Sequence, residues 1–189
     1  MKRIAILASG AGSNAANIMD YFKSKSIVDV VLVASNKADA GVLQIAERHH
    51  VPTFILSKEN FRQGDDFLRV LKSLEVDFIV LAGFLWKVPA EMVKHYPCHI
   101  INIHPALLPK YGGKGMYGHF VHEAVHAAKE KESGITIHWV NEHYDEGAVI
   151  AQYSTEIAEE DSVADIERKV RALEIEWFPR VLEEVLMSC

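Results

Sequence analysis

The chain has 189 residues, of which 49% are hydrophobic and 24% charged, and its formal net charge is -6. This length and composition suit a protein that buries one sizeable core, so we expect a single domain over residues 1–189. The sequence has no basic run, which argues against a nucleic-acid partner, and no apolar stretch of membrane-spanning length. The two cysteines, Cys98 and Cys189, do not suggest a disulfide framework, so we expect a reduced, cytoplasmic protein whose oligomeric state stays open.

Apolar and amphipathic segments alternate through the first half of the chain. Short apolar runs predict strands at 4–8, 28–34, 53–56, 78–82 and 99–103. Helical patterns separate these runs at 14–22, 42–50, 65–74 and 90–95. Continuous apolar strands that alternate with helices indicate an α/β fold with a mainly parallel sheet and helices on both faces.

The second half of the chain changes character. A helix is predicted at 120–129, and the segments 134–140 and 148–153 are typical of a late antiparallel strand pair with a tight connection. A last helix is predicted at 162–185, with Asp161 or Ser162 as its N-terminal cap. Together the elements predict one Rossmann-like domain.

A glycine-rich turn, Gly10-Ala11-Gly12-Ser13-Asn14, follows the first strand and opens a helix. Glycines let the backbone approach an anion, and the free amides at a helix start favour phosphate. The turn also matches the dinucleotide fingerprint, but no acidic residue ends the second strand, although Lys37 could serve a site for NADP. Ser13 and Asn14 add donors that suit a terminal monophosphate, so a phosphate site is favoured over a simple tight turn.

The strand at 99–103 brings Asn102 and His104 to its end, two residues apart and on one face. An amide donor beside a titratable imidazole suits the oxyanion that develops in acyl transfer. The alternative is an ordinary strand end, at which hydrogen bonds within the protein satisfy both polar side chains. Asp145 follows the strand at 134–140 and, from its spacing alone, is a turn residue.

Three histidines, His119, His122 and His126, fall on one face of the helix at 120–129 and its N-terminal boundary. Imidazoles in this arrangement could bind zinc or nickel, and Glu123 is close in sequence. No cysteine or carboxylate completes an obvious set of ligands, so a partly solvated helix face is the favoured interpretation.

Two motifs resemble signatures of the folate-dependent formyltransferases, in particular of members that act on phosphoribosylglycinamide in purine synthesis. The first is N-I-H-P-A-L-L-P-K-Y at 102–111, and the second is G-x-T-x-H-x-V at 134–140 followed by D-x-G at 145–147. The resemblance covers most of the chain. It implies formyl transfer from 10-formyltetrahydrofolate, as a cosubstrate, to the amine of glycinamide ribonucleotide, without a metal.

The same resemblance implies roles for individual residues. The catalytic group would be Asn102, His104 and Asp145. The ribonucleotide would be held by Gly12, Ser13, Asn14 and Glu174. The folate would be bound by Arg62, Leu85, Trp86, Lys87, Val88 and Asn102. Asp145 would pair with His104, because a nearby carboxylate raises the pKa of an imidazole and stabilises its charged form.

This chain departs from the family pattern at Trp86, Ile175 and the loop at 112–118, so ligand contacts there are open. Two other functions use the same motifs. An N-formyltransferase acting on a nucleotide-linked amino sugar would need Asn102, His104 and Asp145 as well. A non-catalytic nucleotide-binding module would need only the glycine-rich turn.

Overall fold

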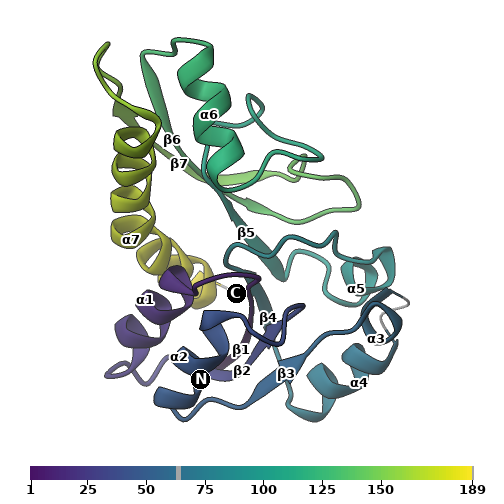
Figure 1. Ribbon diagram of the computed structural model, residues 1–189. Helices are drawn as coiled ribbons and strands as arrows, with labels where there is room; N and C mark the ends of the chain where they lie inside the picture. The colour runs from purple at the N-terminus through teal and green to yellow at the C-terminus, as the bar shows by residue number, and fades with distance from the viewer. Residues whose placement is uncertain (63–64, 189) are drawn as a thin grey trace.

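One seven-stranded sheet runs through the computed structural model, which describes residues 1–62 and 65–188, except for the side chains of Arg62 and Asp65 (Figure 1). The strand order is β3-β2-β1-β4-β5-β6-β7. The strands are β1 (Lys2–Leu7), β2 (Val28–Ser35), β3 (Thr53–Ile55), β4 (Phe78–Leu81), β5 (Ile100–His104), β6 (Glu132–Trp139) and β7 (Val149–Glu156). The first five strands pair in parallel, and β6 and β7 pair antiparallel, as the sequence predicts.

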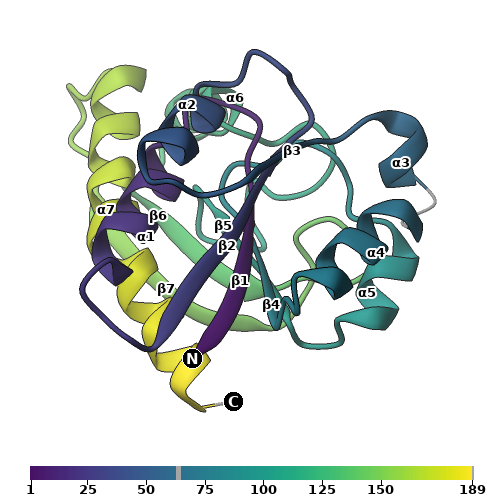
Figure 2. The same cartoon turned by 90° about the horizontal axis from the view of Figure 1, so that it is seen from below.

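Helices cover both faces of this sheet (Figures 1 and 2). One face packs against α1 (Ser13–Phe22), α2 (Gly41–Arg48), α6 (His119–Ala127) and α7 (Val163–Ser188). The other face packs against α3 (Lys58–Arg62), α4 (Asp65–Ser73) and α5 (Ala90–His95).

Side chains of β1 alternate between the two cores, as the pleat of a strand requires. Ile4 and Ile6 belong to the core under α1 and α7, whereas Ala5 and Leu7 belong to the core under α4. All four side chains are fully buried. A strand buried on both faces has no polar face, which is why this segment is a continuous apolar run in the sequence.

Two local features differ from the sequence-based expectations. The connection between β6 and β7 is the loop 140–148 and is not tight, because this loop carries Asp145 into a cavity. The short helix α3 was not predicted, although its start has a signal. The Ser57 hydroxyl accepts a hydrogen bond from the Asn60 N–H at 3.1 Å, and the Ser57 N–H donates to Asn60 Oδ1 at 2.8 Å.

The order of strands along the sheet changes direction between β1 and β4. Strands β2 and β3 extend the sheet from one edge of β1, and β4 and β5 extend it from the other. Ligands of open parallel sheets bind beyond the carboxyl ends of strands at such a point. None of the helices in the described ranges is long and apolar enough to cross a membrane.

Candidate active site

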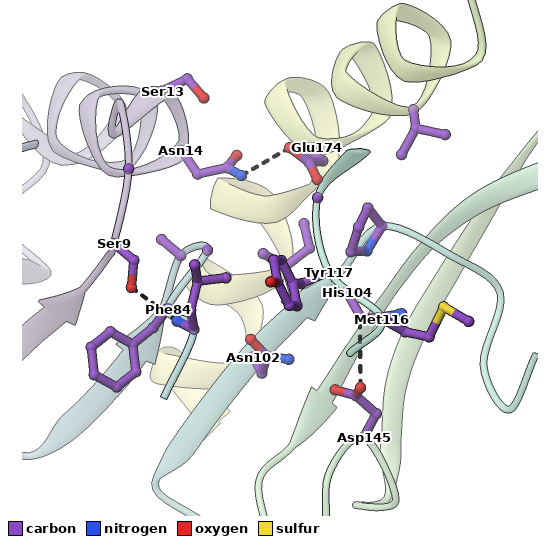
Figure 3. Close-up of a pocket in the computed structure, with 18 of the residues that line it drawn as sticks. Ser9, Ser13, Asn14, Phe84, Asn102, His104, Met116, Tyr117, Asp145 and Glu174 are labelled. Carbon is purple, nitrogen blue, oxygen red and sulfur yellow. Dashed lines mark hydrogen bonds and ion pairs between the residues drawn. The ribbon is translucent and has the colours of Figure 1, made fainter. Parts of the chain in front are cut away.

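A cavity of about 640 Å³ opens where the parallel strands end (Figure 3). Its wall contains most of the residues singled out in the sequence, drawn from five separate parts of the chain. These are Gly12, Ser13, Asn14, Leu85, Asn102, His104, Asp145 and Glu174. The fold thus brings the predicted catalytic group and the predicted ribonucleotide residues into one space.

The glycine-rich turn approaches α2 closely. Gly12 has φ of 83°, and a Cβ atom at this position would lie 2.7 Å from the Val42 Cα. Only glycine fits both the left-handed backbone and this contact. No side chain of the described residues caps the start of α1, so its first N–H groups remain for a ligand.

Asn14 and Glu174 meet across this cavity although 160 residues separate them. The Asn14 amide donates to the Glu174 carboxylate at 2.9 Å, and Figure 3 shows this contact between α1 and α7. Burial raises the pKa of Glu174, while the hydrogen bond from Asn14 acts in the opposite direction. The carboxyl group is therefore an acceptor held at a fixed place in the wall.

Asn102 is oriented by His138, which lies opposite it in the antiparallel pair of β5 and β6. His138 Nδ1 donates to the Trp139 carbonyl oxygen at 2.9 Å, which leaves Nε2 to accept from the Asn102 amide at 3.0 Å. One N–H of the amide is used in this way, and the second is free to serve a ligand. His138 is almost fully buried, so the contact is well shielded from water.

His104 is buried, with one ring nitrogen in a hydrogen bond and the other facing Asp145. Nε2 donates to the Tyr111 carbonyl oxygen at 2.7 Å, and Nδ1 lies 3.7 Å from Asp145 Oδ2. Burial lowers the pKa of His104 by more than the Asp145 charge and the Tyr111 contact raise it. Asp145 thus acts on the pKa of His104 in the expected direction, but desolvation outweighs it, so the pKa lies below its usual value.

Asp145 adopts a left-handed backbone conformation in the loop 140–148, with φ of 55°. Its Oδ2 accepts from the Gly113 N–H at 2.9 Å, and its Oδ1 lies 3.7 Å from His138 Nε2. Burial acts to raise the pKa of Asp145, but its neighbours His138, His104 and Gly113 hold it below the usual range. The carboxylate is thus charged and points at the imidazole of His104 (Figure 3).

Gly147 explains the spacing of the second motif. A Cβ atom at Gly147 would lie only 1.6 Å from the Trp139 carbonyl oxygen. Glycine is therefore needed two residues after Asp145, so that the loop can fold back against the end of β6.

The predicted folate residues separate into two groups. Leu85 lines the cavity, together with Phe84 and Tyr144, which the sequence did not single out. The side chains of Trp86, Lys87 and Val88 do not line it. Trp86 packs against Phe61 at 5.8 Å between ring centroids, Lys87 is exposed near Tyr144, and Val88 is in the core.

An aromatic cluster and the core take up Trp86 and Val88, so these side chains lie outside the wall of this cavity, and their role in folate binding stays a prediction. Arg62 cannot be assessed, since its side chain lies outside the described part of the chain.

Three further residues of the cavity wall, Lys37, His122 and Arg171, were not assigned to the ribonucleotide from the sequence. Lys37 was considered only for a site for NADP, and Arg171 was missed, although a phosphate site needs a positive charge nearby. His122 was instead grouped with His119 and His126.

The structure separates these three histidines. His122 is buried with an unpartnered Nδ1, whereas His119 and His126 are exposed. His119 Nε2 lies 3.3 Å from Glu123. Within residues 1–62 and 65–188, no three His, Cys, Asp or Glu side chains converge as metal ligands would.

The sheet carries Asn102, His104 and Asp145 in one cavity beyond its strand ends, which is the place where open α/β folds bind ligands. The formyl transferase family matches residues 2–182, and the chain belongs to this family. It is 37% identical to phosphoribosylglycinamide formyltransferase of Haemophilus influenzae, over 97% of this chain and 86% of that protein.

The chloroplastic phosphoribosylglycinamide formyltransferase of Arabidopsis thaliana is 39% identical over 89% of this chain, which spans 60% of that protein's length. Among solved structures, glycinamide ribonucleotide transformylase 1 from Geobacillus kaustophilus superposes with a TM-score of 0.90. It is 33% identical, over 98% of this chain and 99% of that one.

Proposed function

We propose that this protein transfers the formyl group of 10-formyltetrahydrofolate to the amine of glycinamide ribonucleotide, a step of purine synthesis. The observation that carries the proposal is one cavity that holds both an Asn-His-Asp group and a glycine-rich turn suited to a monophosphate. Relatives with the same name in bacteria and plants support it. No metal enters the proposed reaction.

The ribonucleotide is assigned to the end of the cavity formed by α1 and α7. Its phosphate would lie against Gly12, Ser13 and Asn14, with Lys37 and Arg171 as the positive charges that line the same cavity. Glu174 would accept hydrogen bonds from the sugar hydroxyls. The site suits a single phosphate, because the second strand ends in Ser35-Asn36-Lys37 without a carboxylate for a dinucleotide ribose.

The folate is assigned to the opposite end, along the segment that follows β4. Leu85, Phe84 and Tyr144 supply the apolar surface that a flat ring needs. Trp86, Lys87 and Val88 follow Leu85 and are assigned to the folate side from the resemblance alone, and Arg62 is assigned to the glutamate tail. The formyl carbon would then lie near Asn102, between the two substrates.

The reaction is assigned to positioning and to stabilisation of charge. The amine nitrogen attacks the formyl carbon, and the carbonyl oxygen becomes an oxyanion that the free N–H of Asn102 stabilises. The proton that the amine loses passes to the His104–Asp145 pair. It is returned to the folate nitrogen when the tetrahedral carbon collapses and the carbon–nitrogen bond to the folate breaks.

A neutral imidazole suits this role better than a charged one. Burial lowers the pKa of His104, so the ring is ready to accept a proton at neutral pH. Asp145, whose carboxylate lies 3.7 Å from Nδ1, would stabilise the imidazolium once it forms. His138 would keep the Asn102 amide in place throughout.

One assay tests the proposal directly. Purified protein is mixed with 10-formyltetrahydrofolate and glycinamide ribonucleotide, and the formylated product is measured by mass spectrometry. Transfer to a nucleotide-linked amino sugar, but not to glycinamide ribonucleotide, would select the other formyltransferase reaction. Thermal stabilisation by a dinucleotide, without a response to folate, would instead indicate a binding module.

A cytoplasmic location is part of the proposal. An exposed thiol such as Cys98 suits a reducing compartment. Two of the relatives, from Arabidopsis thaliana and Vigna unguiculata, carry names that place them in chloroplasts. Microscopy of the tagged chain in its own cells would test the location.

A further inference from the structure

Ser9 lies two residues beyond the end of β1, where three segments of the cavity wall meet. It precedes the glycine-rich turn, and its exposed fraction is 2%. Neither sequence motif contains it. Figure 3 shows its side chain directed away from the glycine-rich turn and toward the segment around Phe84.

The Ser9 hydroxyl uses both its donor and an acceptor position in contacts within the protein. It donates to Asn36 Oδ1 at 2.6 Å, and it accepts from the Leu85 N–H at 2.9 Å. The Ser9 backbone N–H also donates to the Gly83 carbonyl oxygen at 3.0 Å. One residue thus joins the turn after β1, the turn after β2 and the segment after β4.

These three segments bear different ligands under the proposed function. The turn after β1 holds the phosphate, and Lys37, next to Asn36, lines the same cavity. The segment at 83–88 holds the folate. The distance between the amine and the formyl carbon therefore depends on how these segments are held relative to one another.

We propose that Ser9 is a positioning residue, whose hydroxyl sets the folate segment in register with the phosphate-binding turn. This inference rests on the proposed function and deepens it. Ser9 touches no reacting atom. Its effect is on the alignment of two bound substrates, and misalignment by about 1 Å can cost on the order of 100-fold in rate.

The test compares binding with turnover in Ser9→Ala. In this variant the Leu85 N–H and Asn36 Oδ1 lose their shared partner. The single-turnover rate at saturating concentrations of both substrates should fall roughly 10- to 100-fold. The dissociation constant of glycinamide ribonucleotide alone, measured by calorimetry, should change less than about threefold, since the turn itself is intact.

Asn36 supplies a graded series. Asn36→Ala removes only the contact to the turn after β2, so its loss of rate should be smaller than that of Ser9→Ala. Asn36→Asp keeps the accepting oxygen and should restore most of the rate. The double variant Ser9→Ala, Asn36→Ala should be no slower than Ser9→Ala, because both act through one hydroxyl.

Ser133→Ala is the matched control. Ser133 is also a buried serine, at 3% exposure, but its hydroxyl has no partner among the described residues and it does not line the cavity. Its removal should leave the rate unchanged. If Ser9→Ala does not fold, the rates of Asn36→Ala and Asn36→Asp decide the question.

Two failures are distinguishable. If the wild-type protein does not formylate glycinamide ribonucleotide, the proposed function is wrong. If the wild-type protein does so and folded Ser9→Ala keeps its single-turnover rate within twofold, the positioning role is wrong. Equal rates in Asn36→Ala and Asn36→Asp would also overturn it.

Discussion

Under the proposed function, the Asn102 amide stabilises the oxyanion. His138 holds one N–H of this amide, so the group is oriented before any ligand arrives. Asn102→Ala should lower kcat by roughly 100- to 1000-fold, the usual effect of removing one oxyanion donor. Steady-state kinetics on the folded variant is the measurement, and a kcat within fivefold of wild type would contradict the assignment.

His104 and Asp145 should act as a unit. His104→Ala should cost at least as much turnover as Asn102→Ala, because the imidazole moves the proton. Asp145→Asn should also be slow, since an imidazolium would lack its paired charge. The double variant His104→Ala, Asp145→Ala should be little worse than His104→Ala alone.

Circular dichroism on each variant provides the folding control for this series. Fully additive losses would indicate that Asp145 has a separate role, for instance through its contact with Gly113.

At the residue scale, the side chains that face the cavity were more predictable from the sequence than the side chains that orient them. Asn102 and His104 were predictable because a strand end presents alternate residues on one face. His138 stands in the G-x-T-x-H-x-V motif at 134–140, but its role was not predicted, because the motif does not say which side chain it contacts. Its contact with Asn102 depends on the register of β5 and β6, which only the folded sheet fixes.

At the scale of elements, the segment after β4 shows how packing overrides a motif. Trp86 follows Leu85 at a position assigned to folate, yet its ring belongs to a cluster with Phe61 and Phe84. This cluster includes a residue of α3, the helix that the sequence did not predict. Because α3 was not predicted, the sequence offered no packing partner from this helix for Trp86, and a ligand was the other interpretation.

The position of Trp86 leads to a prediction about stability. Trp86→Ala should lower the free energy of unfolding by about 2–3 kcal/mol, below the range for a fully buried aromatic because the ring is partly exposed. Urea denaturation measures this change. Trp86→Phe should recover most of the loss. An unchanged urea midpoint in Trp86→Ala would show that the cluster contributes little.

At the scale of the whole molecule, the alternation of strands and helices, the mainly parallel sheet and the helices on both of its faces followed from the hydrophobic pattern. The order of the strands in the sheet did not, because it depends on pairing between distant segments. Nor did the electrostatics of the site. The pKa of His104 depends on burial and on charges from distant segments, and no local sequence pattern reveals their combined effect. The proximity of Asn14 and Glu174 likewise arises only when α7 packs beside α1.

Two buried histidines should make the fold sensitive to acid. Burial lowers the pKa of both His104 and His122 in the folded protein from the usual 6.5. Below that pH the unfolded chain therefore binds more protons than the folded protein. The free energy of unfolding should be fully retained above about pH 6.5, and should fall as the pH drops toward the folded-state pKa values.

Chemical denaturation between about pH 7.5 and pH 5 would measure how steeply the free energy of unfolding falls with pH. His122→Gln isolates the contribution of one histidine to this slope, because an amide has no proton to gain in this range. The variant should lose less stability than wild type over the same interval. Glu174, whose pKa burial raises, acts in the opposite sense but is common to both proteins. His126→Gln, on the exposed face of the same helix, is the matched control. A slope in His122→Gln equal to that of wild type would show that His122 is not the source of the acid sensitivity.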